Sequence, residues 1–287
     1  MTLVPDPPRH PEPPVLPEVP EGVTPAPRDT APAWHPLVAF SAFIAAFLAA
    51  GVFGSIVLVA SGDTDDPPAW ANIAATLLQD VALIGAALGF AALAARPRAW
   101  HFGLRPVRRL RAAVGWTVLA YVAFIAFSAL FLTAVGADQT DDLPQDLGVD
   151  ESTAAAIGIG VLVCVGAPLV EEFFFRGYLY GAFRRWRGPW VGAILVGVLF
   201  GAVHAGGSDA AYLVPLAALG VGFCLLYERT GSLYPPIVLH AVNNSVAFSV
   251  SMDFSWQVPL VMVGSLAVIA AILALVRQAT GPAPRPA

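Results

Sequence analysis

Charged residues are scarce in this sequence. It contains no lysine, and only 12% of its 287 residues are charged, whereas 57% are hydrophobic. Soluble domains carry about 25% charged residues, so this composition is atypical of a soluble protein. No basic run resembles a nucleic-acid-binding surface, so no nucleic-acid partner is expected. The composition predicts an all-α, polytopic membrane protein.

Several features of known protein classes are also missing. Cys164 and Cys224 are the only cysteines, and both lie in apolar segments. We therefore expect them to pack in the interior and not to form a disulfide or a metal site. The sequence lacks the His-Glu-x-x-His motif of many zinc proteases. It also lacks the internal inverted repeat of many transporters.

The first 33 residues differ from the rest of the chain. They contain eleven prolines and almost no apolar periodicity, so we expect a disordered tail. This stretch has no basic region followed by an apolar core, as a signal peptide would. The first apolar segment is therefore expected to remain as a membrane span.

Apolar segments of membrane-spanning length fill most of the remaining sequence. There are about eight, near 35–60, 70–95, 112–135, 153–183, 189–205, 211–227, 234–250 and 257–277. From this pattern we predict four parts of the chain. They are the proline-rich cytoplasmic tail 1–33, the first three spans in 34–150, a catalytic core in 151–256, and the last span with a short C-terminal tail in 257–287.

Arginines alternate between successive connections and so predict the orientation. Six lie in the connection 96–111, and more follow at 184–187, Arg229 and Arg277, whereas the other connections carry acidic residues and no arginine. Because positively charged loops stay in the cytoplasm, both termini are expected to be cytoplasmic. We expect an integral protein of a bacterial cell membrane.

The most unusual stretch is Val161 to Arg176. An apolar run is followed directly by Glu171, Glu172, three phenylalanines and Arg176. Each charge costs roughly 2.5–3.5 kcal/mol at the bilayer centre, so such groups are functional candidates. On a helix, Glu172 and Arg176 are one turn apart and are expected to pair. Glu171 points about 100° away and remains free for another role.

Four other polar residues interrupt apolar segments. Three of them lie after residue 176, and the fourth lies in the second segment, 70–95. His204 ends one segment, and His240 and Asn244 share a face of another. A lone histidine in a membrane helix is most often a packing residue, but this set together can perform hydrolysis. A desolvated carboxylate can take a proton from water, and a histidine with an amide can donate to an oxyanion. For Asp80, in the second segment, we expect a hydrogen bond to a neighbouring helix or a position closer to water.

Three motifs in order resemble the CPBP family of intramembrane proteases. That family includes the CAAX prenyl endopeptidases and the Abi proteins linked to bacteriocin processing and self-immunity. Its Glu-Glu-x-x-x-Arg, Phe-x-x-x-His and His-x-x-x-Asn/Asp motifs match residues 171–176, 200–204 and 240–244. The resemblance covers roughly residues 155 to 250. It implies an endopeptidase that acts on a membrane-associated peptide or protein substrate within the lipid bilayer.

The family also implies roles for the matching residues. Glu171 would activate water together with His204, while His240 and Asn244 would stabilise the oxyanion. Glu172 and Arg176 would support the helix. Two chemistries remain open, one without a metal and one with a divalent metal, Zn²⁺, bound by Glu171, His204 and His240. The metal-free reading, which needs no cofactor, is slightly favoured because asparagine is a poor zinc ligand.

Other functions remain possible from the sequence. The same ionisable residues suit a proton- or ion-coupled transporter, or the chain is a non-catalytic scaffold. Helix length places a condition on the connection after the fifth segment, because the 17 residues from Arg187 to His204 span about 26 Å of helix. If His204 faces a site open to the cytoplasm, the connection 205–210 must dip into the protein, where non-helical backbone has to be buried or face water.

Overall fold

The computed structural model describes residues 32–137, 143–205 and 207–281. The predicted tail 1–33 lies almost wholly outside these residues. Within them the regular structure is helical throughout, so the all-α prediction is confirmed. The helices and helical turns are α1 (Pro36–Ser61), α2 (Ala69–Ala92), η1 (Ala99–Phe102), α3 (Leu110–Val135), α4 (Leu143–Asp146), α5 (Thr153–Val161), η2 (Leu162–Gly166), α6 (Ala167–Glu171), η3 (Glu172–Tyr180), α7 (Gly181–Ala202), η4 (Ala210–Tyr212), α8 (Leu213–Thr230), α9 (Tyr234–Ser251) and α10 (Val258–Thr280).

Every predicted segment coincides with a helix or a run of helical turns, but the number of clear membrane spans is smaller. Six runs in the described part of the chain are long and apolar enough to cross a membrane. One of them, the 50-residue run Thr153–Ala202, contains two predicted segments. α9 is not among the six, because its polar site residues reduce its hydropathy. The count of about eight is therefore approximate.

The long run Thr153–Ala202 bends between its two predicted halves. Gly188 has φ 82° and ψ 170°, values outside the helical region, and Pro189 follows it. A positive φ is readily adopted by glycine, and proline starts a helix well because it needs no N–H donor there. The break between the predicted segments 153–183 and 189–205 therefore lies at these two residues.

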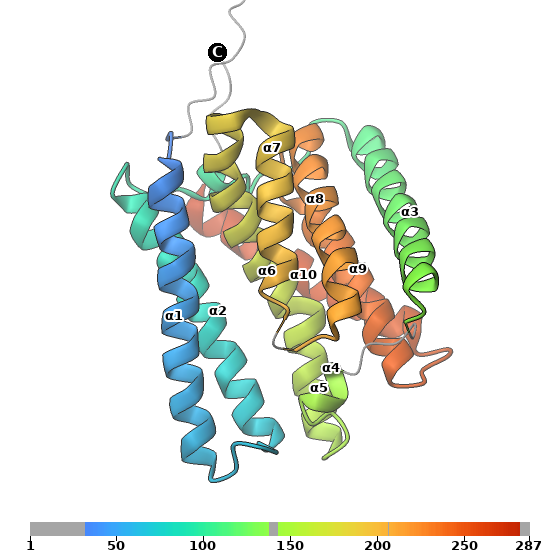
Figure 1. The fold of residues 1–287 in the computed structure, drawn as a ribbon. Coiled ribbons are helices and arrows are strands. Elements are labelled where there is room, and N and C mark those ends of the chain that lie inside the picture. The colour runs from blue at the N-terminus through green and yellow to red at the C-terminus, as the bar shows by residue number, and fades with distance from the viewer. Residues whose placement is uncertain (1–31, 138–142, 206, 282–287) are drawn as a thin grey trace, which may run out of the picture. The chain divides into compact units, whose positions relative to one another are not determined.

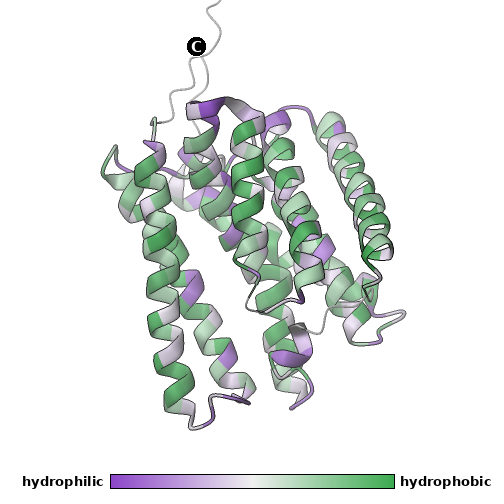
Figure 2. Ribbon diagram, viewed as in Figure 1, coloured by the Kyte–Doolittle hydropathy of each residue, from purple (hydrophilic) through white to green (hydrophobic). Residues whose placement is uncertain are grey.

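The helices leave much apolar surface uncovered by protein. Only 6% of the most apolar stretch of α3, and 17% of that of α10, is buried. Figure 2 shows apolar residues along most of the helix length and polar residues concentrated near helix ends and connections. Such surfaces need a lipid environment, which agrees with an integral membrane protein.

Glycines allow α7 and α8 to pack very closely. A Cβ on Gly201 would lie 2.5 Å from the Leu213 carbonyl oxygen, and one on Gly197 would lie 2.5 Å from a methyl group of Val221. Figure 1 shows that α7 ends and α8 begins part-way along the length of α1 and α2. The described ends of the connection after α7 therefore do not reach as far as the ends of α1 and α2, which is compatible with the conditional expectation of a connection that dips into the protein.

The arginine-bearing connections gather at one end of this helical bundle. In Figure 1, α3 and α7 begin, and α8 ends, at the same end. The connections there are those with the predicted cytoplasmic arginines, Arg184 to Arg187 and Arg229 among them. This agreement fixes which loops share a side. The identity of that side stays a prediction.

Candidate active site

Both glutamates lie on a helical run that is wound more widely than an α-helix. η2 and η3 are π-helical, and α6 lies between them with Pro168 in its first turn. The N–H of Ala167 bonds to the carbonyl of Leu162, five residues earlier. Proline lacks an N–H and its ring clashes with the carbonyl four residues earlier, so a wide turn is the local solution.

Glu172 and Arg176 form the expected ion pair. Arg176 Nη1 lies 2.9 Å from Glu172 Oε1, and both side chains are 0% exposed. Arg176 Nη2 also donates to the Gly220 carbonyl at 3.2 Å. The guanidinium lies over the rings of Phe200 and Phe223, at 4.3 and 4.8 Å from their centroids. This arrangement compensates a charge pair that is costly to bury.

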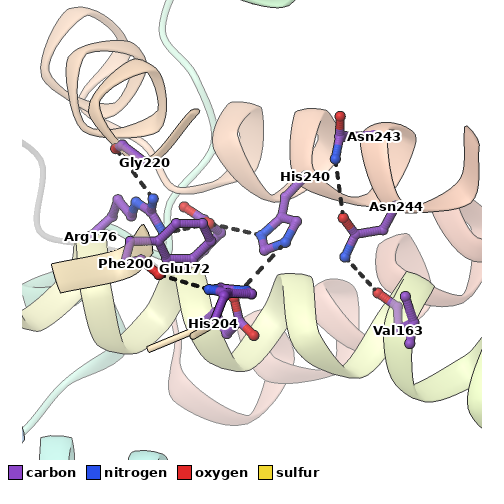
Figure 3. Close-up of polar contacts among 10 residues, drawn as sticks. Val163, Glu172, Arg176, Phe200, His204, Gly220, His240, Asn243 and Asn244 are labelled. Carbon is purple, nitrogen blue, oxygen red and sulfur yellow. Dashed lines mark hydrogen bonds and ion pairs between the residues drawn. The ribbon is translucent and has the colours of Figure 1, made fainter. Parts of the chain in front are cut away.

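His240 connects the two glutamates. Its Nδ1 donates to Glu172 Oε1 at 2.9 Å, so Glu172 binds both Arg176 and a second helix, α9. Its Nε2 lies 4.0 Å from Glu171 Oε2. The imidazole stacks on Phe223 with ring centroids 5.1 Å apart. Figure 3 shows this histidine between the ion pair and the α9 asparagines.

Glu171 has no such fixed partners. Its side chain is 15% exposed, yet its Oε2 is buried without a hydrogen-bond partner in the described chain. The separation from His240 Nε2 exceeds a direct hydrogen bond. Glu172 Oε2 is likewise buried without a hydrogen-bond partner among the described residues. The two adjacent glutamates differ because Oε1 of Glu172 is fixed by Arg176 and His240, whereas Glu171 makes no hydrogen bond with a residue that the structure describes.

His204 lies in the turn that follows α7. Its Nδ1 donates to the Phe200 carbonyl at 2.7 Å, which leaves Nε2 available. Its ring packs on Phe200 at 4.9 Å between centroids, and His240 contacts the same phenylalanine at 5.9 Å. The second and third motifs thus meet around one aromatic ring.

Asn244 also faces the first motif. Its Nδ2 donates to the Val163 carbonyl at 2.9 Å, and its Oδ1 accepts from Asn243 Nδ2 at 3.3 Å. The carbonyl of Val163 lies in η2, one helix segment before the glutamates. The structure therefore brings together the side chains of Glu171, Glu172, Arg176, His204, His240 and Asn244 on four helical segments.

Asp80 differs from its expected environment. It makes no hydrogen bond with any residue that the structure describes, although it is only 9% exposed. Its Oδ2 lies against Gly166, where an added Cβ would be 3.5 Å away. Its carboxylate also interacts electrostatically with Glu171. The expected hydrogen bond to a neighbouring helix is thus replaced by a position beside the η2 turn.

The residues do not assemble a metal site in this arrangement. Across 32–137, 143–205 and 207–281, no group of three or more His, Cys, Asp or Glu side chains is placed to hold a metal ion. Tetrahedral zinc ligands with bonds near 2.0–2.1 Å lie roughly 3.3 Å apart. The 4.0 Å between Glu171 Oε2 and His240 Nε2 is longer. The steps proposed below therefore use protein groups alone. Cys164 and Cys224 are both buried and free.

Sequence reasoning missed several contributors to the site. It assigned Glu172 to Arg176 alone and did not anticipate the bond to His240. It also missed Phe223 and the Gly220 carbonyl, both on α8, and the Val163 carbonyl. Nothing marks these groups in the sequence, because apolar residues and backbone atoms acquire a role only through packing.

Comparisons with known proteins agree with this site. The family model of the Type II CAAX prenyl endopeptidase Rce1-like proteins matches residues 153–246. A Bacillus subtilis (strain 168) protein named "Putative membrane peptidase YdiL" is 30% identical over 37% of this chain and 41% of its own length. An Escherichia coli protein named "Uncharacterized 24.3 kDa protein" is 30% identical over 50% of this chain and 67% of its own length.

The matched region contains all three motifs and every residue of the ion-pair network. No solved structure matches the chain. The chain spans less than half of the Bacillus subtilis relative but two thirds of the Escherichia coli one. On the family model, these relatives and the assembled motifs, residues 153–246 of the chain belong to the Rce1-like family of Type II CAAX prenyl endopeptidases.

Proposed function

We propose that the protein is an intramembrane endopeptidase that hydrolyses a peptide bond of a membrane-associated protein or peptide, with water activated by Glu171. The observation that carries this proposal is the pairing of a free carboxylate oxygen with a fixed histidine. Glu171 Oε2 has no hydrogen-bond partner and lies 4.0 Å from His240 Nε2. Part of the Glu171 side chain stays exposed, at 15%, so a water molecule can reach the carboxylate from that side.

In the first step Glu171 takes a proton from that water while oxygen attacks the peptide carbonyl carbon. The carbonyl π electrons move to oxygen and form a tetrahedral oxyanion. His204, fixed through Nδ1 to the Phe200 carbonyl, offers Nε2 to hold or share the proton of the water. A carboxylate in an apolar surrounding is suited to this work because few dipoles compete for its charge.

His240 and Asn244 stabilise the oxyanion. Both ring nitrogens of His240 face carboxylate oxygens, at 2.9 Å from Glu172 and 4.0 Å from Glu171, so Nδ1 is held by Glu172 while Nε2 faces the site. Asn244 Nδ2 has two hydrogens, and Val163 uses one of them. Donors fixed in advance reduce the reorganisation needed when charge develops.

In the last step the C–N bond breaks and the proton held by Glu171 passes to the leaving amine. The products are a carboxylic acid, which gives its remaining proton to solvent, and a new N-terminus, and Glu171 is again ionised. No other acid is required, because the group that accepted the proton returns it.

Cleavage of a peptide library by the purified protein, with and without a chelator, tests this function. We expect cleavage that persists with chelator and is absent from Glu171→Gln. A Glu171→Gln protein that cleaves at the wild-type rate would remove the general-base assignment. One zinc ion bound per chain, lost together with activity in His240→Ala, would replace the metal-free chemistry with a zinc site.

A further inference from the structure

One backbone carbonyl in the site has no backbone donor available to it. In an α-helix the Val163 carbonyl would accept from the N–H of residue 167, but Ala167 donates to Leu162 instead. In a π-helical turn the donor would be residue 168, and Pro168 has no N–H. The wide turn and the proline together leave this half-buried carbonyl unpaired within its own helix. Such a group is costly unless another donor reaches it.

Asn244 provides that donor. Its Nδ2 lies 2.9 Å from the Val163 oxygen, and because a carbonyl only accepts, the amide nitrogen must face it. Asn243 donates to the other end of the amide, Asn244 Oδ1, at 3.3 Å. Figure 3 shows Asn244 between these two partners. The amide plane is therefore held at both its oxygen and its nitrogen, and one N–H remains uncommitted.

His240 is held in a parallel way. It commits Nδ1 to Glu172 and leaves Nε2 free. Each of these two groups on α9 thus uses one donor to bind the glutamate-bearing run and keeps one polar group for the site, the second N–H of Asn244 and Nε2 of His240. The hydrogen bond of His240 has a side chain, Glu172, as its acceptor. The acceptor of the Asn244 bond is a carbonyl that has no backbone donor at residue 168, because that residue is proline.

We propose that Pro168 and Asn243 are positioning residues that orient Asn244 for oxyanion stabilisation. Pro168 acts by withholding an N–H, which reserves the Val163 carbonyl for Asn244. Asn243 acts by fixing the amide oxygen, which directs the remaining N–H. This inference rests on the proposed function, since it gives an orientation to the donor assigned there.

Pro168→Ala tests the first residue. An alanine N–H can bond to the Val163 carbonyl or allow an α-helical turn, so Asn244 loses its reserved acceptor. We expect kcat to fall about tenfold to 10²-fold with KM changed less than about twofold, the pattern of a misplaced transition-state donor. The unfolding temperature should stay equal or rise, because an interior helix proline is removed. A role in stability alone would lower the unfolding temperature as well.

Pro259→Ala is the matched control. Pro259 lies in the first turn of α10, where a backbone N–H has no intrahelical partner. Its replacement should leave kcat and KM unchanged. For Asn243, replacement by leucine keeps the size but removes the donor to Asn244, and kcat should fall about fivefold.

A double-mutant cycle separates this inference from the proposed function. In an Asn244→Ala background, Pro168→Ala should cost no further activity. Asn244→Ala should also lower the unfolding temperature of the wild type but not that of Pro168→Ala, and this readout needs no activity. The positioning role would be overturned if Asn244→Ala lowered the unfolding temperature equally in the wild type and in Pro168→Ala. It would also be overturned if the two substitutions reduced kcat additively, or if Pro168→Ala kept full activity. A wild-type protein that cleaves no peptide would contradict the proposed function. The double-mutant cycle of unfolding temperatures would then still test the contact between Asn244 and the Val163 carbonyl.

Discussion

At the scale of single residues, the site depends on the different environments of two adjacent carboxylates. Glu172 is 0% exposed and its Oε1 is bound by Arg176 and His240, whereas Glu171 is 15% exposed and makes no hydrogen bond with a residue that the structure describes. Oε2 of each glutamate is buried without a partner in that part of the chain. A carboxylate that already accepts from two donors is a poor base, because its lone pairs and charge are compensated. The chemistry is therefore assigned to the partner that packing leaves free.

Glu171→Gln should abolish peptide cleavage and leave the protein folded and inserted. The amide keeps the shape of the side chain but cannot take a proton from water. The measurement is kcat for a cleaved peptide alongside the unfolding temperature in the same detergent. Glu228→Gln is a useful control, since Glu228 is a glutamate of the bundle outside the site that bonds to Tyr180 and Arg184. A loss of cleavage of the same size in Glu228→Gln would show that the assay reports on stability.

Glu172→Ala and Arg176→Ala should each destabilise the protein by about 3–5 kcal/mol, because each leaves an unpaired charge in the interior. The double change should be milder than the sum of the single changes. Glu172→Ala should also lower activity, since His240 loses the acceptor on Nδ1. Unfolding in denaturant checks the cycle, and strict additivity would contradict the pairing.

Asn244→Ala should reduce kcat by about 10²–10³ with a smaller effect on KM and no effect on metal content. The reason is that an oxyanion donor acts on the transition state. Kinetics and metal analysis of the same preparation measure both quantities. A parallel loss of bound metal and activity would instead make this residue a support of a metal site.

At the scale of helices, the position of His204 depends on the close approach of α7 and α8. Gly201 lies three residues before His204, and its Cα faces the backbone of α8. Any side chain there must separate the two helices, and the turn that carries the histidine moves with them.

Gly201→Ala should therefore reduce both stability and activity. The added Cβ would lie 2.5 Å from the Leu213 carbonyl and 2.9 Å from Ala217, and overpacking of this kind costs about 1–3 kcal/mol. Gly222→Ala on α8 is the matched control, since its Cβ would meet nothing within 4 Å. Thermal unfolding and kcat for the pair decide the point. Equal behaviour of the two variants would show that α7 and α8 can separate without consequence.

At the scale of the whole described bundle, the arginine-bearing connections share one end, and that end is predicted to be cytoplasmic. Single cysteines can test this, because both native cysteines are buried. In sealed inside-out vesicles, a membrane-impermeant thiol reagent should label Arg108→Cys and not Asp65→Cys. Right-side-out vesicles should give the reverse pattern. The opposite result in both preparations would invert the assigned topology.

The sequence alone determined the helical class, the approximate span positions, the break before Pro189 and the three motifs with their order. These depend on local composition and on spacing within one helix, where i and i+4 positions have known geometry. The Glu172–Arg176 pair was predictable for this reason. The condition on the depth of the connection after α7 also followed from the sequence, since helix length limits how far His204 can lie from Arg187.

Only the tertiary structure decided how the motifs meet. The bonds from Arg176 to Gly220, from Glu172 to His240 and from Asn244 to Val163 join residues 44 to 81 positions apart. The stacking of Phe223 on His240 joins two separate helices, α8 and α9. Sequence spacing carries no information on which faces of distant helices touch. The lack of a hydrogen-bond donor to Glu171 among the described residues is likewise a result of packing, because it depends on where the neighbouring helices place their donors.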